Sequence, residues 1–141
     1  MSIVKRTTTW LAVMVAAATM TTIAAASPSS ASVIVPTNAT AYGPNGGYGY
    51  AFYNADTNVL SIHDSHADGY GIAVINWRTD LAKQGPYFGW NRDGNGTTVY
   101  YYLHMPPGTR IKFYLCAEQD GLAIGTKCGQ TVTGYAGGAN A

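Results

Sequence analysis

Clusters of glycine with asparagine, aspartate or proline recur along the chain, and they constrain the fold more than any other feature of the sequence. They lie at 43–47, 67–69, 92–96, 106–108 and 120–121. These residue types supply the positive or fixed φ angles that turns require. No segment after residue 31 keeps the 3.6-residue apolar period of an amphipathic helix. The sequence therefore predicts short strands separated by turns.

The segments between these turns are rich in β-branched and aromatic residues. They are 48–53, 58–63, 70–77, 97–105, 109–117 and 126–135, with a weaker one at 86–90. Short strands at this spacing are typical of an antiparallel sandwich or small barrel. We expect an all-β fold: a small antiparallel β-sandwich of immunoglobulin or fibronectin type, with about six or seven strands.

Alternation within two of these segments predicts which rings face outward. Tyr100 and Tyr102 share one face of the segment 97–105, and Tyr114 lies on the polar face of 109–117. A tight hairpin at 106–108 would unite the two faces in one patch, whereas a crossing between sheets would put them on opposite sides of the domain. The united patch would contain Tyr100, Tyr102, His104, Arg110, Lys112 and Tyr114.

The same connection carries a local resemblance. The segment Leu103–Thr109 is similar to the L-x-P-G-T corner of fibronectin type III domains, at which the chain crosses between sheets. Ile111 stands where that family has its corner tyrosine. The resemblance implies a sandwich and says nothing about a ligand.

The N-terminal segment is predicted to be a secretory signal peptide. Lys5 and Arg6 precede an apolar stretch at 10–18, which small residues follow up to Ala31. The stretch is shorter than the roughly 20 apolar residues of a membrane span. Cleavage after Ala26 or after Ala31 satisfies the small-residue rule, and we prefer Ala31.

The expected exported protein is one domain, 32–141, and it is poor in charge. Only 11% of the whole chain is charged, against roughly 25% in a typical soluble domain. Removing 1–31 takes away two basic residues and no acid, so the net charge changes from +1 to −1. This balance argues against a nucleic-acid partner, which needs a basic stripe.

Cys116 and Cys128 are predicted to form a disulfide, because an even cysteine count in an exported protein favours one. A loop of this size stabilises the fold by about 3 kcal/mol. A zinc site is not expected, since no C-x-x-C pair or flanking histidine completes one. We expect no metal and no cofactor.

The order of these motifs resembles a set of small secreted β-domain proteins of actinobacteria. The matching features are the turn Asp64–Gly69 (D-x-x-A-D-G), the segment Gly108–Cys116 (G-T-x-x-x-F-x-x-C) and the later Cys128. The resemblance implies an extracellular location and an all-β domain, and it implies no activity.

Candidates for catalysis are few. Asp64, Ser65 and His66 are triad residue types, but neighbours on an extended chain point to opposite faces. A calcium-loop reading of the same segment fails at Ile75, where the pattern needs a glutamate. The remaining carboxylates lie in or beside turns, as solvated or turn-forming groups do. We therefore predict a protein that is not an enzyme, with a small hydrolase as the least favoured class.

The eleven tyrosines are the most informative residues for function. Tyrosine combines a rigid apolar ring with a polar tip, and it is enriched at interfaces. In a charge-poor β protein it also serves simply as surface cover. The ligand-binding candidates are Tyr100, Tyr102 and Tyr114 first, and Trp90 and the segment 42–53 second.

A second hypothesis starts from Trp77 and Arg78. This pair resembles the Trp-Arg-Tyr wedge of microbial α-amylase inhibitors, although Thr79 replaces the tyrosine and two cysteines stand in place of four. Burial of Trp77 in the core is the simpler explanation for its position on a strand that is apolar on both faces.

Two functions remain open. The leading one is a secreted, non-catalytic binding module for a polysaccharide, a cell-envelope component or an extracellular protein. The alternative is a secreted inhibitor or toxin that acts on an extracellular enzyme or a competitor cell, with Trp77 and Arg78 as its hot spot.

Overall fold

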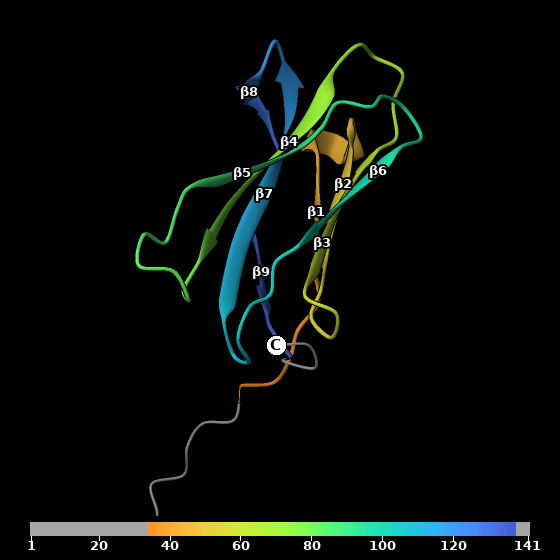
Figure 1. Cartoon of the computed structure of the whole chain (residues 1–141). Helices are drawn as coiled ribbons and strands as arrows, with labels where there is room; N and C mark the ends of the chain where they lie inside the picture. Colours follow the sequence, from red (N-terminus) through yellow and green to blue (C-terminus); the bar gives the residue numbers. More distant parts are fainter. Residues whose placement is uncertain (1–33, 138–141) are drawn as a thin grey trace, which may run out of the picture. The chain divides into compact units, whose positions relative to one another are not determined.

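Two antiparallel β-sheets face each other in the computed structural model, which describes residues 34–137 (Figure 1). The expected signal peptide lies outside the described residues. The first sheet has the order β1-β2-β3-β6. Its strands are β1 (Ala39–Tyr42), β2 (Gly49–Asn54), β3 (Val59–Asp64) and β6 (Thr98–Tyr102).

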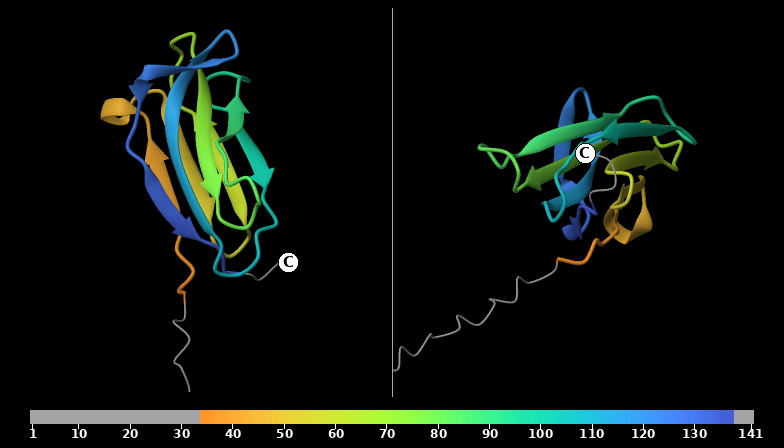
Figure 2. Two further views of the ribbon diagram at one scale, coloured as in Figure 1. Left: turned by 90° about the vertical axis from the view of Figure 1, so that its left-hand side faces the viewer. Right: turned by 60° about the horizontal axis from the view of Figure 1, so that its bottom comes forward.

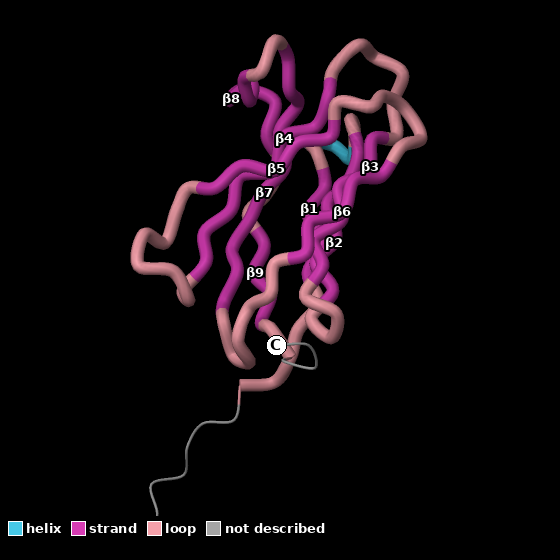
Figure 3. Tube along the Cα trace, viewed as in Figure 1, coloured by secondary structure: helices cyan, strands magenta, loops and turns pink. Residues whose placement is uncertain are grey.

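The second sheet has the order β5-β4-β7-β8, with β9 also paired to β7. Its strands are β4 (Gly71–Arg78), β5 (Tyr87–Asn91), β7 (Arg110–Gln119), β8 (Leu122–Cys128) and β9 (Val132–Tyr135). Apart from one short 3-10 turn, η1 (Pro44–Gly46), the described chain is strand and loop (Figure 3). The predicted all-β sandwich is confirmed, with nine strands where the sequence predicts six or seven.

Two differences account for the strand number. The predicted strand 126–135 is two strands, which pair with β7 one after the other: β9 opposite Arg110–Phe113 and β8 opposite Cys116–Gln119. Gly129 separates them where the chain passes close to β1, since a Cβ there would lie 1.7 Å from the carbonyl oxygen of Tyr42. Strand β1 was not predicted, because its four residues, Ala-Thr-Ala-Tyr, carry little β-branched or apolar bulk.

The core fills the space between the sheets. Alternate residues of each strand point inward, and the largest fully buried ones come from both sheets. They include Tyr53, Leu60, Ile62, Ile72, Phe113 and Leu115. Figure 2 shows the two layers from two further directions.

The chain crosses from one sheet to the other between β6 and β7, through the turn 106–108. Of the two arrangements left open by the sequence, the crossing is therefore the one found. A buried network holds this crossing: Tyr53 donates a hydrogen bond to Asn58 Oδ1 (2.9 Å), and Asn58 Nδ2 donates one to the carbonyl of Met105 (3.1 Å). Burial raises the pKa of the Tyr53 hydroxyl to about 12, against a smaller lowering effect from Arg78.

The predicted disulfide is confirmed. Cys116 on β7 and Cys128 on β8 are bonded directly across the two strands. Within 34–137, no helix has the length and apolar character needed to cross a membrane.

Candidate functional site

The outer side of the first sheet carries a group of exposed rings that we call the tyrosine face. Four of its tyrosines are 38–69% exposed. The side chains that define it are Tyr42, Tyr50, Phe52, His63, Tyr100 and Tyr102.

Strand register places these rings in rows that run across the sheet. One row contains Tyr42, Tyr50 and His63, which pair across β1, β2 and β3. The centroids of the Tyr42 and Tyr50 rings are 6.3 Å apart, and those of Tyr50 and His63 are 4.9 Å apart. Thr98 on β6 ends the row, with its Oγ1 2.8 Å from His63 Nδ1. The rings are thus ordered by packing against one another.

Small polar side chains separate the rings in the neighbouring rows. Thr40, Phe52, Ser61 and Tyr100 form the second row, and Asn54, Val59 and Tyr102 form the third. In the described chain, no lysine, arginine, aspartate or glutamate projects from this side of the four strands. The tyrosine face is therefore a grid of rings, hydroxyls, one amide and one aliphatic side chain, without a lysine, arginine or carboxylate.

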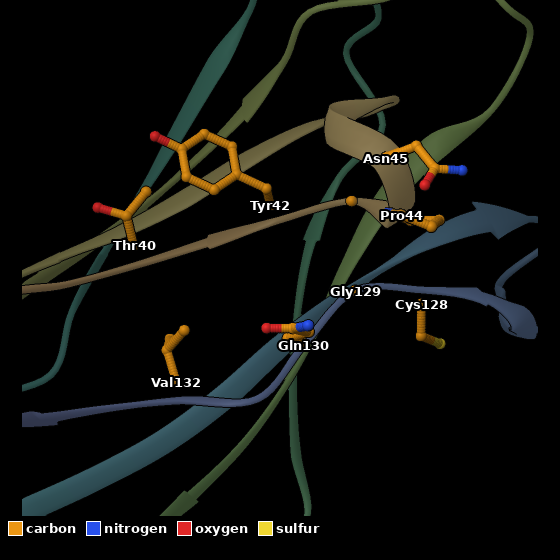
Figure 4. A pocket seen from close by; sticks show the side chains of 9 residues that line it. Thr40, Tyr42, Pro44, Asn45, Cys128, Gly129, Gln130 and Val132 are labelled. Carbon is orange, nitrogen blue, oxygen red and sulfur yellow. The ribbon is translucent and has the colours of Figure 1, made fainter.

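Two hollows adjoin this grid. One, of about 380 Å³, lies among Phe52, Val59, Tyr100 and Tyr102. The other, of about 470 Å³, lies at the Tyr42 corner, where η1 and the connection from β8 to β9 meet β1. Figure 4 shows the side chains of Thr40 and Tyr42 projecting together from β1 above Gln130 and Val132. The face therefore has a hollow at the Tyr42 corner and another among the rings of its second and third rows.

The outer side of the second sheet carries a different group of rings, which we call the tryptophan face. It consists of Trp77, Phe88, Trp90 and Tyr114. Phe88 stacks on Trp90 with centroids 5.6 Å apart and planes within 9°, and Trp77 packs on Tyr114 at 5.8 Å. Phe88 is half exposed, whereas the other three are partly buried. These rings bury much of their surface against one another and against Ala73, Ile75 and the disulfide beneath them.

Contacts between the sheets position the tryptophan face. The Tyr101 hydroxyl accepts a hydrogen bond from the backbone N–H of Trp90 (2.7 Å) and donates one to the backbone carbonyl of Trp90 (2.9 Å). Tyr101 thereby satisfies both backbone groups of Trp90 on the open side of β5, an edge strand. Gly89 lets the sheets approach here, because a Cβ would lie 3.0 Å from Ile62 Cδ1 and 3.3 Å from the Tyr101 ring.

A cation extends the stack on β5. The Arg92 guanidinium lies 4.5 Å from the centroid of the Trp90 ring, a cation–π geometry. Arg92 Nε also lies 3.1 Å from the carboxylate of Glu118, which is almost fully buried. Arg92, Trp90 and Phe88 therefore form one continuous stack.

The structure divides the predicted site residues among three places. Tyr100 and Tyr102 lie on the tyrosine face, whereas Tyr114, Trp77 and Trp90 lie on the tryptophan face on the other side of the sandwich. Phe88 was missed, although its place two residues before Trp90 on a predicted strand puts both rings on one face.

Arg78 belongs to neither face. Its side chain points inward, is 14% exposed, and lies 2.7 Å from Asp80 Oδ2 and 3.0 Å from the carbonyl of Leu103. Trp77 and Arg78 project from opposite sides of β4. The pair therefore forms no joint wedge, which removes the geometric support for the inhibitor hypothesis.

The segment 64–66 does not have the geometry of a catalytic triad. Asp64 Oδ1 accepts a hydrogen bond from the backbone N–H of His66, and not from its ring. Asp64 Oδ2 is buried without a hydrogen-bond partner in the described chain. Over the same residues, no group of three or more His, Cys, Asp or Glu side chains is placed to hold a metal ion.

Comparison with protein-family models, with curated proteins and with solved structures gives no match for this chain.

Proposed function

We propose that this protein is an exported, non-catalytic carbohydrate-binding module that holds an uncharged polysaccharide on its tyrosine face. The observation that supports this most is the composition of that face, which is a grid of exposed rings and hydroxyls without a lysine, arginine or carboxylate.

Sugars match such a grid chemically. A pyranose ring has an apolar C–H face that packs on an aromatic ring, and its hydroxyls hydrogen-bond at its edge. Tyrosine offers both partners in one side chain, and Thr40, Ser61 and Asn54 add further polar groups between the rings. Covering this face removes no charge from water, so the desolvation cost stays small. An uncharged ligand makes no ion pairs, so its affinity does not depend on charged side chains on this face.

The grid favours binding over hydrolysis. Glycoside cleavage needs a pair of carboxyl groups beside the bound sugar. The carboxylates of the described chain lie in its loops, at the inner position of Asp64 or, for Glu118, on β7 of the second sheet, away from the outer side of the first sheet.

The test is retention of the purified, oxidised protein on insoluble cellulose, chitin and starch, which carry no charge. We expect saturable binding to at least one of them. Replacing two exposed rings (Tyr100→Ala with Tyr102→Ala) should weaken it by about tenfold or more, because each ring contact contributes on the order of 1 kcal/mol.

Phe88→Ala is the matched control, since it removes an exposed ring from the other side of the sandwich. We expect it to bind as the wild type does. Unchanged retention of the double variant would exclude the tyrosine face. Binding to none of the polysaccharides would move the proposal to a protein ligand, for which an uncharged, tyrosine-rich surface is also suited.

A further inference from the structure

A hollow of about 320 Å³ lies at one end of the tryptophan face, and its lining combines rings with cations. We call it the cationic hollow. It is lined by Trp77, Gln84, Arg110, Lys112, Tyr114 and Thr131. The packed pair of Trp77 and Tyr114 provides its apolar surface, with ring planes inclined by 31°.

Two of the three basic side chains of residues 34–137 that have neither an ion pair nor a cation–π contact line this hollow. Arg78 and Arg92 form ion pairs, and the Lys127 ammonium lies 3.9 Å from the centroid of the Tyr70 ring. In residues 34–137, the other basic side chains are Lys83, Arg110 and Lys112, and none of them has an ion pair. Arg110 and Lys112 line the hollow, and Lys83 directly precedes Gln84, which also lines it.

Backbone contacts fix the positions on β7 from which both lining cations project. Arg110 N–H donates a hydrogen bond to Thr79 Oγ1 (3.0 Å), and Thr79 N–H donates one to the Arg110 carbonyl (3.1 Å). Lys112 pairs directly with Trp77 across β7 and β4. Because Arg110 and Lys112 are two residues apart on one strand, they project from the same face roughly 7 Å apart. Arg110 and Lys112 therefore leave the strand beside the rings as two exposed side chains.

Acidic side chains gather at the opposite end of β7. Asp64, Glu118 and Asp120 line a separate hollow of about 560 Å³ there, together with Arg92. No carboxylate lines the cationic hollow. The distribution of charge along β7 therefore attracts an anion to one end of the sheet and repels it from the other.

We propose that the cationic hollow binds a carboxylate-bearing sugar unit of an acidic polysaccharide. The C–H face of the sugar packs on Trp77 and Tyr114, while Arg110 and Lys112 bind its carboxylate through charge-assisted hydrogen bonds. A uronic acid carries its charge on the sugar ring itself, so one unit contacts the rings and the cations together. In a phosphodiester polymer the charge lies between the units. Such a polymer fits this hollow less well, because the cations and the rings of the hollow lie close together.

This site is independent of the tyrosine face, which lies on the other side of the sandwich. One molecule would then hold a neutral polymer on one face and an acidic polymer on the other. Such a molecule links the two polymers.

The test is affinity electrophoresis and calorimetry with polygalacturonate, compared with the same polymer after full methyl esterification. We expect binding to the acid form, none to the ester, and loss of binding as added salt screens the charges. Arg110→Gln and Lys112→Gln should each weaken binding by about fivefold or more, since each removes a charge-assisted contact. Tyr114→Ala should weaken it too, which shows that the rings take part.

Lys127→Gln is the matched control, because it removes the same charge from a lysine outside the hollow. Equal losses in Lys127→Gln and Lys112→Gln would overturn the proposal, since net charge alone would then explain binding. Equal binding to the ester, or tighter binding to poly(glycerol phosphate), would also overturn it. So would self-association, measured by sedimentation, that the charge variants abolish, because a second copy of the chain would then occupy the hollow.

Discussion

The tyrosine face and the tryptophan face are built by the same rule and differ in how their rings are used. On both, alternate residues of neighbouring strands project outward. The tyrosine face leaves four tyrosines 38–69% exposed on an uncharged surface. The tryptophan face packs its rings in pairs against each other and against a disulfide, with cations at both ends.

The two faces therefore differ in how much their rings stabilise the fold and in how much ring surface they leave for a ligand. Rings that stack on protein atoms stabilise the sheet on which they lie, whereas rings that stay exposed keep their surface for a ligand. The tryptophan face therefore acts in part as a small second core, and its exposed parts are Phe88 and the cationic hollow. The tyrosine face contributes less to stability and more to binding.

The largest expected effect comes from removing the disulfide. Cys116→Ala with Cys128→Ala should lower the free energy of unfolding by about 3 kcal/mol, because the unfolded chain regains the entropy of its open loop. The bond lies under the tryptophan face, so tryptophan fluorescence should change along with stability. Urea unfolding measures the first effect and emission spectra the second. A stability equal to that of the wild type would show that the stacked rings suffice to hold β8 against β7.

Alkaline pH should lower the free energy of unfolding through Tyr53, which lies on the inner side of the first sheet. The pKa of Tyr53 is about 12 in the folded state, against 10.0 in the unfolded chain. Its contribution is therefore complete below pH 10 and is lost as pH rises toward 12, by about 2 kcal/mol. Unfolding measured from pH 9 to 12 in the wild type and in Tyr53→Phe isolates this group. Parallel losses in the two proteins would refute the assignment.

Close approach of the two sheets at Gly89 provides the next test. Gly89→Ala brings a Cβ within 3.0 Å of Ile62 and should cost about 2 kcal/mol by overpacking. Gly125→Ala is the control, because a Cβ on that strand residue meets nothing within 4 Å. Thermal or urea unfolding compares the two variants. Equal stability of both would mean that the sheets separate at this point without cost.

The sequence predicts the faces of the strands better than their number or their partners. The two-residue period of a strand places Tyr100, Tyr102 and Tyr114 outward, and the structure confirms this orientation. On β4, the same period puts the side chains of Arg78 and Trp77 on opposite faces of the sheet. The sequence alone could therefore have predicted that the two residues form no joint wedge. The local pattern contains that information because it depends only on neighbours along the chain.

The number of strands and their partners depend on contacts between residues that are far apart in the sequence. Strand β1 pairs with β2 and turns the small side chains of Ala39 and Ala41 into the core between the sheets, and a four-residue window does not show this. The break between β8 and β9 depends on the approach of Gly129 to Tyr42, which lies far away in the sequence. Trp77 looks like a core residue because its strand is apolar on both sides. In the structure, the outer side of that strand is covered by neighbouring rings and not by a further layer.

The smallest effect that we predict concerns the hydroxyl of Tyr101, which holds Trp90 in place from the other sheet. Tyr101→Phe leaves the backbone N–H and carbonyl of Trp90 without their partner and should lower the free energy of unfolding by about 1.5 kcal/mol. Tyr100→Phe, one residue away on the exposed side of β6, should cost close to nothing. Urea unfolding and the emission maximum of the tryptophans measure both variants. An equal loss in the two would contradict the contrast between the faces, because an exposed hydroxyl would then stabilise the sheet as much as one that joins both sheets.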